Sequence, residues 1–361
     1  MKTRIIGYDF ARAFAIFGMV FVNFKIVLDS TTGNETLRVI VSLVEGRASA
    51  LFVVLAGVGI SLLTKTARLQ KDASVIIQKR LSLLKRGILL IVIGLLYTPI
   101  WPADILHFYG FYFLIAAYFI TVSDRLLWGA SAVSCLAFVL LLFIFDYETG
   151  WDFSTLTYLD FWTFAGMFRH IFYNGFHPVI PWLAFIFVGI WLGRQDLSHL
   201  ALRRTIALAS GSVWVLTELA SKASIIVVSQ YLSHSDSYDD IISLLGTSAM
   251  PPMPQYIIAA GSLAILIICL SIEVTEKYPT NRMNTWLAHT GQLSLTLYVA
   301  HVILGMGLLE ALGLLNNKQP IEIAVISAGL FCLVSIVFSH WWVNRYKEGP
   351  LERLFKKISE Q

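Results

Sequence analysis

Apolar runs long enough to cross a membrane recur along the whole chain, from Phe10 to Val343. An α-helix rises 1.5 Å per residue, so roughly 20 apolar residues cross a hydrocarbon core of about 30 Å. Only 14% of the 361 residues are charged and the mean hydropathy is +0.71, whereas soluble domains average about 25% charged residues. The sequence therefore predicts an all-α, polytopic integral membrane protein with no room for a large soluble domain.

About ten segments have this character, and we expect one transmembrane helical bundle over residues 1–361. The third and fourth spans meet at Pro99-Ile100-Trp101-Pro102, which predicts a tight hairpin there. All three cysteines lie within apolar runs, so we expect no disulfide framework. The predicted spans lie near residues 8–28, 39–63, 86–103, 104–122, 126–145, 178–193, 205–231, 255–272, 286–312 and 321–343.

The Lys and Arg residues give these helices a direction. With the N-terminus inside, 20 of the 27 Lys and Arg residues fall on the cytoplasmic side, as the positive-inside rule requires. Seven of these 20 lie in the predicted basic cytoplasmic loop 64–86. We therefore expect both termini in the cytoplasm and a multi-pass protein of a bacterial cytoplasmic (inner) membrane, in contact with membrane lipids. Oligomerisation stays open, and a net charge of +4 without a clustered soluble face gives no reason to expect a nucleic-acid partner.

Two predicted external segments are long. Segment 146–177 is rich in aromatic residues, which favours an aromatic belt at the membrane surface or a lid that stacks on sugars, and residues 160–174 could form an amphipathic helix. Segment 233–254 carries acidic residues and prolines and is typical of an ordinary external loop.

Polar side chains gather at one predicted depth in the outer half of the membrane. Asn23 lies roughly 22 Å along the first helix, and His301 lies about as far along the ninth. Ionisable groups at membrane depth cost about 2.5–3.5 kcal/mol each on insertion scales and indicate a functional site. The candidate catalytic residues of this layer are Asn23, Arg47, Asp104, His107, His177 and His301.

This set of residues suits general acid–base chemistry, because histidine titrates near neutral pH. Two alternatives stay open: His107 and His177 could lie in interfacial water, and His301 could be a hydrogen-bonded core histidine. The chain has no phosphate-binding glycine loop, no His-Glu-x-x-His, no Cys-x-x-Cys and no Gly-x-Ser-x-Gly motif. We therefore expect no metal, and the outer polar layer is the candidate site.

Five segments have recognisable sequences: 9–23 (DFARAFAIFGMVFVN), 45–52 (EGRASALF), 104–109 (DILHFY), 291–298 (GQLSLTLY) and 349–352 (GPLE). Together they resemble the YeiB-like family of bacterial membrane proteins (domain of unknown function 418), over nearly the whole chain. That family is distantly similar to the transmembrane acyltransferases, which include the lysosomal heparan-glucosaminide N-acetyltransferase and bacterial glycan O-acetyltransferases. Segment 174–182, NGFHPVIPW, is also similar to a Pro-x-x-Pro-Trp segment of related bacterial proteins.

The resemblance implies a transmembrane acyltransferase that moves an acyl group from cytosolic acyl-CoA to an extracytoplasmic glycan or a similar hydroxyl or amine acceptor. It implies that Asn23 helps to hold the reacting oxygen, and Arg47 is a second candidate donor. Residues 24–47 contain no histidine, so the base would be His107, His177 or His301. The alternative is a non-enzymatic carrier, or a protein that binds lipids or small molecules, using the same polar layer.

Overall fold

The structure is a computed structural model that describes residues 5–232, 238–316 and 318–360. Helices dominate the described residues, and one short antiparallel pair of strands joins Trp151 to Tyr158. The elements are α1 (Ile6–Val27), α2 (Glu35–Ser42), α3 (Arg47–Leu63), α4 (Lys65–Gln70), α5 (Ala73–Tyr97), α6 (Leu106–Ala116), α7 (Asp124–Ile144), β1 (Trp151–Asp152), β2 (Thr157–Tyr158), α8 (Phe164–Arg169), η1 (His170–Asn174), α9 (Val179–Leu192), α10 (Leu200–Leu232), α11 (Tyr238–Leu245), α12 (Pro254–Lys277), α13 (Arg282–Gln292), α14 (Ser294–Ala300), η2 (His301–Met306), α15 (Gly307–Ala311), η3 (Leu314–Asn316), α16 (Ile321–Tyr346) and α17 (Pro350–Glu360).

The prediction of a helical membrane protein is confirmed. In the described part of the chain, seven helices are long and apolar enough to cross a membrane. The number becomes eight if the bent pair Phe164–Asn174 and Val179–Leu192, with a 46° angle, is one span. The seven are Ile6–Val27, Glu35–Leu63, Asp124–Ile144, Leu200–Tyr231, Pro254–Lys277, Ser294–Ala311 and Ile321–Tyr346.

Three predicted boundaries were wrong. The basic segment 64–86 is not a loop, because α4 and the first half of α5 lie within it, and Asp72 caps α5 by accepting hydrogen bonds from the backbone N–H groups of Ser74 and Val75. The predicted span 104–122 contains a helix of only 11 residues, α6. The predicted span 286–312 is divided at Leu293, which has non-helical backbone angles between α13 and α14.

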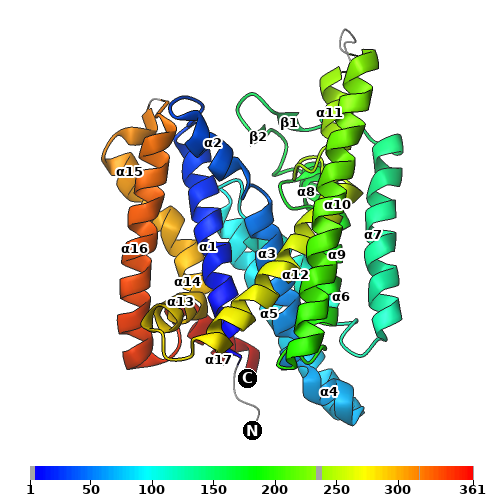
Figure 1. The fold of residues 1–361 in the computed structure, drawn as a ribbon, viewed down its shortest axis with the longest axis vertical. Helices are drawn as coiled ribbons and strands as arrows, with labels where there is room; N and C mark the ends of the chain where they lie inside the picture. The colour runs from blue at the N-terminus through cyan, green and yellow to red at the C-terminus, as the bar shows by residue number, and fades with distance from the viewer. Residues whose placement is uncertain (1–4, 233–237, 317, 361) are drawn as a thin grey trace. The chain divides into compact units, whose positions relative to one another are not determined.

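The predicted external loop 233–254 contains α11, and residues 233–237 lie outside the described residues. In Figure 1, α11 runs beside α10. The Ser221 hydroxyl of α10 donates a hydrogen bond to the Leu245 carbonyl at the end of α11, at 2.6 Å. The C-terminal end of α11 is therefore in contact with α10.

Contacts divide the chain into two compact units, and each is described by itself. The first comprises Met1–Phe52, Asp196–Leu208 and Ala264–Lys357, and the second comprises Val53–Gln195, Ala209–Leu263 and Ile358–Gln361.

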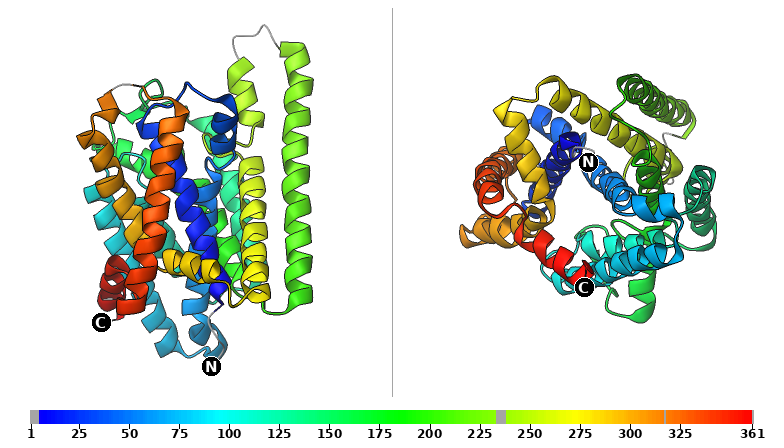
Figure 2. Two further views of the ribbon diagram at one scale, coloured as in Figure 1. Left: turned by 60° about the vertical axis from the view of Figure 1, so that its left-hand side comes forward. Right: turned by 90° about the horizontal axis from the view of Figure 1, so that it is seen from below.

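In the first unit, helix α1 is the central element. Helices α13, α14 and α16 pack against it, with α16 alongside and α13 across one end (Figures 1 and 2). Gly18 allows close approach to Ala48, because a Cβ at Gly18 would lie 2.6 Å from the Ala48 side chain. Arg12 and Asp9 form an ion pair at 2.6 Å within the first turns of α1.

In the second unit, α5 and α6 form the predicted hairpin, and α7 packs against α9. Glycines set the close approach of α3 and α9: a Cβ at Gly57 would lie 2.8 Å from the Gly189 Cα. A Cβ at Gly193 would lie 2.8 Å from the Ser61 side chain. The Gly189-x-x-x-Gly193 motif therefore acts as small-residue packing, as is usual in membrane helices.

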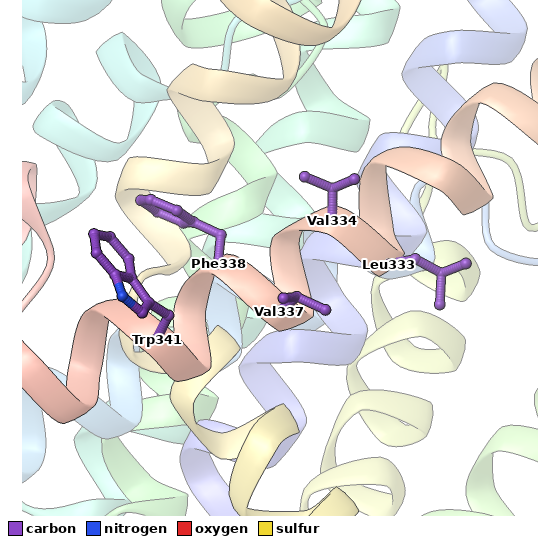
Figure 3. Close-up of a pocket in the computed structure, with 5 residues that line it drawn as sticks. All are labelled: Leu333, Val334, Val337, Phe338 and Trp341. Atoms are coloured by element: carbon purple, nitrogen blue, oxygen red, sulfur yellow. The ribbon is translucent and has the colours of Figure 1, made fainter.

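Apolar side chains also point away from the core, as lipid-facing helices require. On α16, Leu333, Val334 and Val337 are 59–67% exposed. Figure 3 shows that they line a shallow apolar groove with Phe338 and Trp341. Such a surface would be costly in water but is stable against lipid chains.

Candidate functional site

In the first unit, the structure joins Asn23 to His301, two residues that are 278 positions apart in sequence. The Asn23 Nδ2 lies 2.9 Å from the His301 Nε2. His301 is fully buried, whereas Asn23 is partly exposed. The pair therefore has one end fixed in the core and one end within reach of a ligand.

The hydrogen bonds of His301 determine which ring nitrogen carries the proton. Its Nδ1 contacts the backbone carbonyl of Tyr298, and a carbonyl oxygen can only accept. The Nδ1 is therefore the protonated nitrogen of the neutral ring. The lone pair then lies on Nε2, where it accepts a hydrogen bond from the Asn23 amide.

A local irregularity of the helix presents His301 to α1. His301 is the first residue of η2, a π-helical segment between α14 and α15, and such segments are frequent at functional sites. Gly305 in the same segment allows α1 to come near, since a Cβ there would lie 2.8 Å from the Phe24 ring. Phe24 directly follows Asn23, so this approach supports the Asn23–His301 contact.

Arg47, the second predicted donor, lies at the first residue of α3. Its guanidinium Nη1 is 3.5 Å from the Glu45 carbonyl oxygen, which is a long contact for a hydrogen bond. The Glu45 carboxylate pairs with Lys25 at 2.5 Å. The first unit thus has an ion pair between Lys25, which follows Asn23 on α1, and Glu45, which precedes α3.

In the second unit, Asp104 and His107 form a closed pair at the start of α6. The Asp104 Oδ2 accepts hydrogen bonds from the backbone N–H groups of Leu106 (2.9 Å) and His107 (3.2 Å), and lies 3.1 Å from the His107 Nδ1. Both side chains are fully buried, so His107 does not lie in interfacial water as one alternative supposed. The His107 Nε2 is buried without a hydrogen-bond partner among the described residues.

The sequence reasoning missed His170. Its ring stacks near that of His107, with centroids 6.0 Å apart, and its side chain is buried. No motif or spacing marks this residue, because the irregular segment 146–176 brings it to α6. His177 also belongs to this cluster: its carbonyl accepts a hydrogen bond from the Tyr112 hydroxyl at 2.6 Å, and its ring packs against Trp182.

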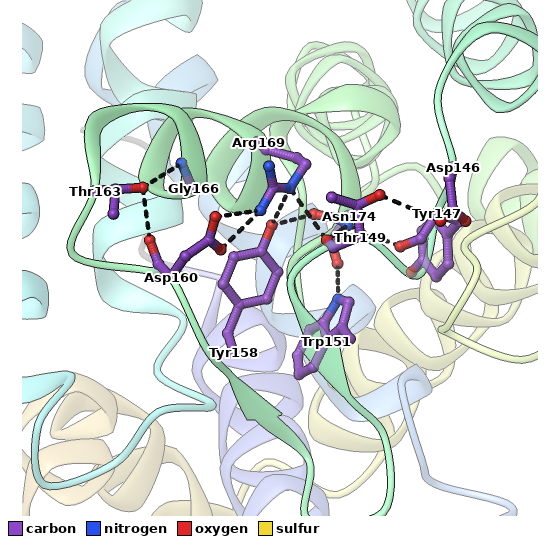
Figure 4. A network of polar contacts seen from close by, with 10 residues as sticks. All are labelled: Asp146, Tyr147, Thr149, Trp151, Tyr158, Asp160, Thr163, Gly166, Arg169 and Asn174. Atoms are coloured by element: carbon purple, nitrogen blue, oxygen red, sulfur yellow. Dashed lines mark hydrogen bonds and ion pairs between the residues drawn. The ribbon is translucent and has the colours of Figure 1, made fainter.

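The segment that carries His170 is held by a buried polar network, drawn in Figure 4. The Asn174 amide donates to the carbonyls of Tyr147 and Thr149 and accepts from the Tyr158 hydroxyl. The Trp151 indole N–H donates to the Asn174 carbonyl at 2.6 Å. Trp151 and Tyr158 are therefore core residues of a small folded segment, so the prediction of an aromatic belt was wrong for them.

An ion pair between Arg169 and Asp160 also holds the segment that carries His170. Arg169 donates two hydrogen bonds to the Asp160 carboxylate, at 2.7 and 2.8 Å, and one to the Tyr158 hydroxyl. Helices α8 and η1 lie within the range where an amphipathic helix was predicted. Trp162, Phe164 and Phe168 are exposed there and are free to meet an interface.

The two clusters differ in what they can do chemically. The Asn23–His301 pair combines a partly exposed hydrogen-bond donor, Asn23, with a buried ring of defined tautomer, His301. The Asp104–His107 pair resembles the acid and base of a hydrolase triad, but both groups are closed off. Among the described residues, no group of three or more His, Cys, Asp or Glu side chains could hold a metal ion.

Comparison with known families agrees with this architecture. Residues 4–235 match the model of the family described as "Heparan-alpha-glucosaminide N-acetyltransferase, catalytic". Residues 213–360 match the family described as "Protein of unknown function (DUF418)". No curated protein matches the chain. The chain belongs to the heparan-alpha-glucosaminide N-acetyltransferase catalytic family and continues into a DUF418 region.

Proposed function

We propose that this member of the acetyltransferase family is a transmembrane acyltransferase. It takes an acyl group from cytosolic acyl-CoA and places it on a hydroxyl or amine of an extracytoplasmic glycan or similar acceptor. The proposal includes ten membrane crossings, both termini in the cytoplasm, and residence in a bacterial cytoplasmic membrane. The excess of Lys and Arg on one predicted side supports that orientation.

The Asn23–His301 hydrogen bond is the observation that carries the proposal. Acyl transfer needs a base for the attacking hydroxyl and a donor for the oxygen that becomes negative. The family match covers Asn23. The loop after α1 has no histidine, and the 2.9 Å contact supplies one from η2 instead.

In the proposed reaction, the acceptor hydroxyl takes the place of the Asn23 amide as the hydrogen-bond donor to the His301 Nε2. The hydroxyl oxygen attacks the thioester carbon as its proton passes to Nε2. The acyl–sulfur bond breaks, the acyl–oxygen bond is formed, and the proton leaves His301 for the CoA thiolate. The Tyr298 carbonyl stabilises the protonated ring, because it accepts a hydrogen bond from Nδ1 throughout.

In this step, Asn23 stabilises the negative charge that develops on the carbonyl oxygen of the thioester. Once its amide no longer donates to Nε2, the N–H group can donate to the carbonyl oxygen of the thioester. A preorganised donor of this kind is worth about 3–4 kcal/mol in the transition state.

The test is the acyl-CoA-dependent release of free thiol by purified protein in the presence of an amino sugar or glycan acceptor. We expect Asn23→Ala to lower kcat by about 10²–10³-fold and His301→Ala to lower it by about 10²–10⁴-fold. The chain offers a matched control. Asn344 and His340 on α16 make the same type of contact, Nδ2 to Nε2 at 3.1 Å, at an exposed position, and Asn344→Ala or His340→Ala should leave the rate unchanged.

Folded wild-type protein that releases no thiol with any acyl-CoA would contradict the proposal. Movement of an unmodified ligand into liposomes, without covalent change, would support a carrier instead. Loss of activity in His107→Ala together with full activity in His301→Ala would move the base to the second unit.

A further inference from the structure

Helix α14, which directly precedes His301, has no capping side chain of its own at its first turn. The N-cap residue of α14 is Leu293, whose side chain makes no capping hydrogen bond. The first N–H groups of a helix have no partner within that helix and need one from outside. A residue near the C-terminus of the chain provides this hydrogen-bond partner.

That residue is Glu352 on α17. Its Oε1 accepts hydrogen bonds from the backbone N–H groups of Leu295 (2.8 Å) and Thr296 (3.1 Å), and its Oε2 accepts one from the Thr296 hydroxyl at 2.5 Å. The Thr296 hydroxyl oxygen in turn accepts from the Leu351 N–H at 3.2 Å. A carboxylate at this point also opposes the positive end of the α14 dipole.

The turn before α17 is shaped for this contact. A Cβ on Gly349 would collide with the Glu352 carboxylate and would lie 3.0 Å from the Thr296 hydroxyl oxygen. Glycine at position 349 therefore leaves the space that the carboxylate and the hydroxyl occupy.

Helix α14 connects this cap to the catalytic pair. His301 lies five positions after Thr296, about 7.5 Å along a helix. Tyr298, whose carbonyl fixes the tautomer of His301, lies between them. The axial position and rotation of α14 therefore determine where the His301 Nε2 meets Asn23.

We infer that Glu352 is a positioning residue: it caps α14 from the C-terminal helix and so holds His301 in register with Asn23. The inference rests on the proposed function for its kinetic readout. Loss of the cap frees the first turn of α14 and displaces the imidazole. Displacements of about 1 Å are enough to cost about 10²-fold in rate.

The kinetic test compares Glu352→Ala with Glu352→Gln in the full-length protein. We expect Glu352→Ala to lower kcat by about tenfold to a hundredfold, with the KM for acyl-CoA little changed. Glu352→Gln should restore most of the rate, because its amide oxygen still accepts from the Leu295 and Thr296 N–H groups. The matched control is Glu348→Ala, which breaks the exposed Glu348–Lys356 pair without touching α14.

A second readout does not depend on activity. In protein with ¹⁵N-labelled histidine, the His301 resonances, identified by their absence in His301→Gln, report which nitrogen carries the proton. We expect Glu352→Ala to shift them and Glu348→Ala to leave them unchanged. Unchanged resonances, or wild-type kcat in folded Glu352→Ala, would overturn the inference. A wild-type protein without acyl transfer would instead overturn the proposed function, and the resonances would still decide the role of Glu352.

Discussion

The two buried histidines His301 and His107 differ in their hydrogen-bond partners. Both ring nitrogens of His301 have partners, the Tyr298 carbonyl and the Asn23 amide. His107 has the Asp104 carboxylate on Nδ1, but its Nε2 has no partner among the described residues. The described residues therefore supply partners for both ring nitrogens of His301 but for only one ring nitrogen of His107.

Glu352 gives a prediction about pH. Burial raises the pKa of its carboxyl group, and the hydrogen bonds from Thr296 and Leu295 oppose part of that rise. Because this pKa is higher in the folded state than in the unfolded state, the protonated carboxyl group favours folding. Its contribution to the free energy of unfolding is complete below the ordinary carboxyl pKa of 4.5 and is lost as the pH rises through the folded-state pKa. We therefore expect the Tm of wild type minus that of Glu352→Gln to decrease as the pH rises above the ordinary carboxyl pKa of 4.5.

Thermal unfolding in detergent over a pH series measures this difference. Glu348→Gln serves as the control, because Glu348 lies in an exposed ion pair. A difference that stays constant over the pH range would show that Glu352 has the same pKa in the folded and unfolded states.

At the level of secondary-structure elements, glycines decide which helices come close enough to build a site. Gly87 and Gly110 face each other in the α5–α6 hairpin: a Cβ at Gly87 would lie 2.8 Å from the Gly110 carbonyl oxygen. A Cβ at Gly94 would lie 2.8 Å from the Asp104 Oδ2 and would collide with the His107 backbone. The hairpin was predictable from its prolines, but the contact that buries Asp104 and His107 depends on these glycines.

Gly94→Ala should therefore destabilise the protein. The added methyl group has no free space, and overpacking of this kind costs about 1–3 kcal/mol. Gly129→Ala in α7 is the matched control, because nothing lies within 4 Å of its Cβ position and alanine favours a helix over glycine by about 1 kcal/mol. The measurement is the Tm of each variant in detergent, and equal Tm values for Gly94→Ala and wild type would contradict the tight contact.

At the level of the whole molecule, the number of crossings depends on three segments. Helix α6 has 11 residues, the pair Phe164–Asn174 and Val179–Leu192 is bent, and α5 is not among the seven helices that meet the criteria of length and apolarity. The proposal of ten crossings with both termini on one side of the membrane rests on the distribution of Lys and Arg along the sequence.

Cysteine labelling in intact cells tests this topology. In a variant without the three native cysteines, which are all free, we expect Ser154→Cys to react with an impermeant thiol reagent from outside. Lys71→Cys should react only after permeabilisation, and so should a cysteine placed after the C-terminal residue. Labelling of the C-terminal cysteine in intact cells would contradict a cytoplasmic C-terminus.

The sequence by itself determined the helical membrane architecture, because apolar runs and helical rise are local properties. It also marked Asn23 and His301 as separate candidates. Only the tertiary structure decided that these two residues meet, that His170 lies beside His107, and that Glu352 caps the helix of His301. Each of these contacts joins segments that are far apart in sequence or folded irregularly. Residue periodicity carries no information about such contacts, which are set by glycine-dependent packing and by the pairing of buried polar groups.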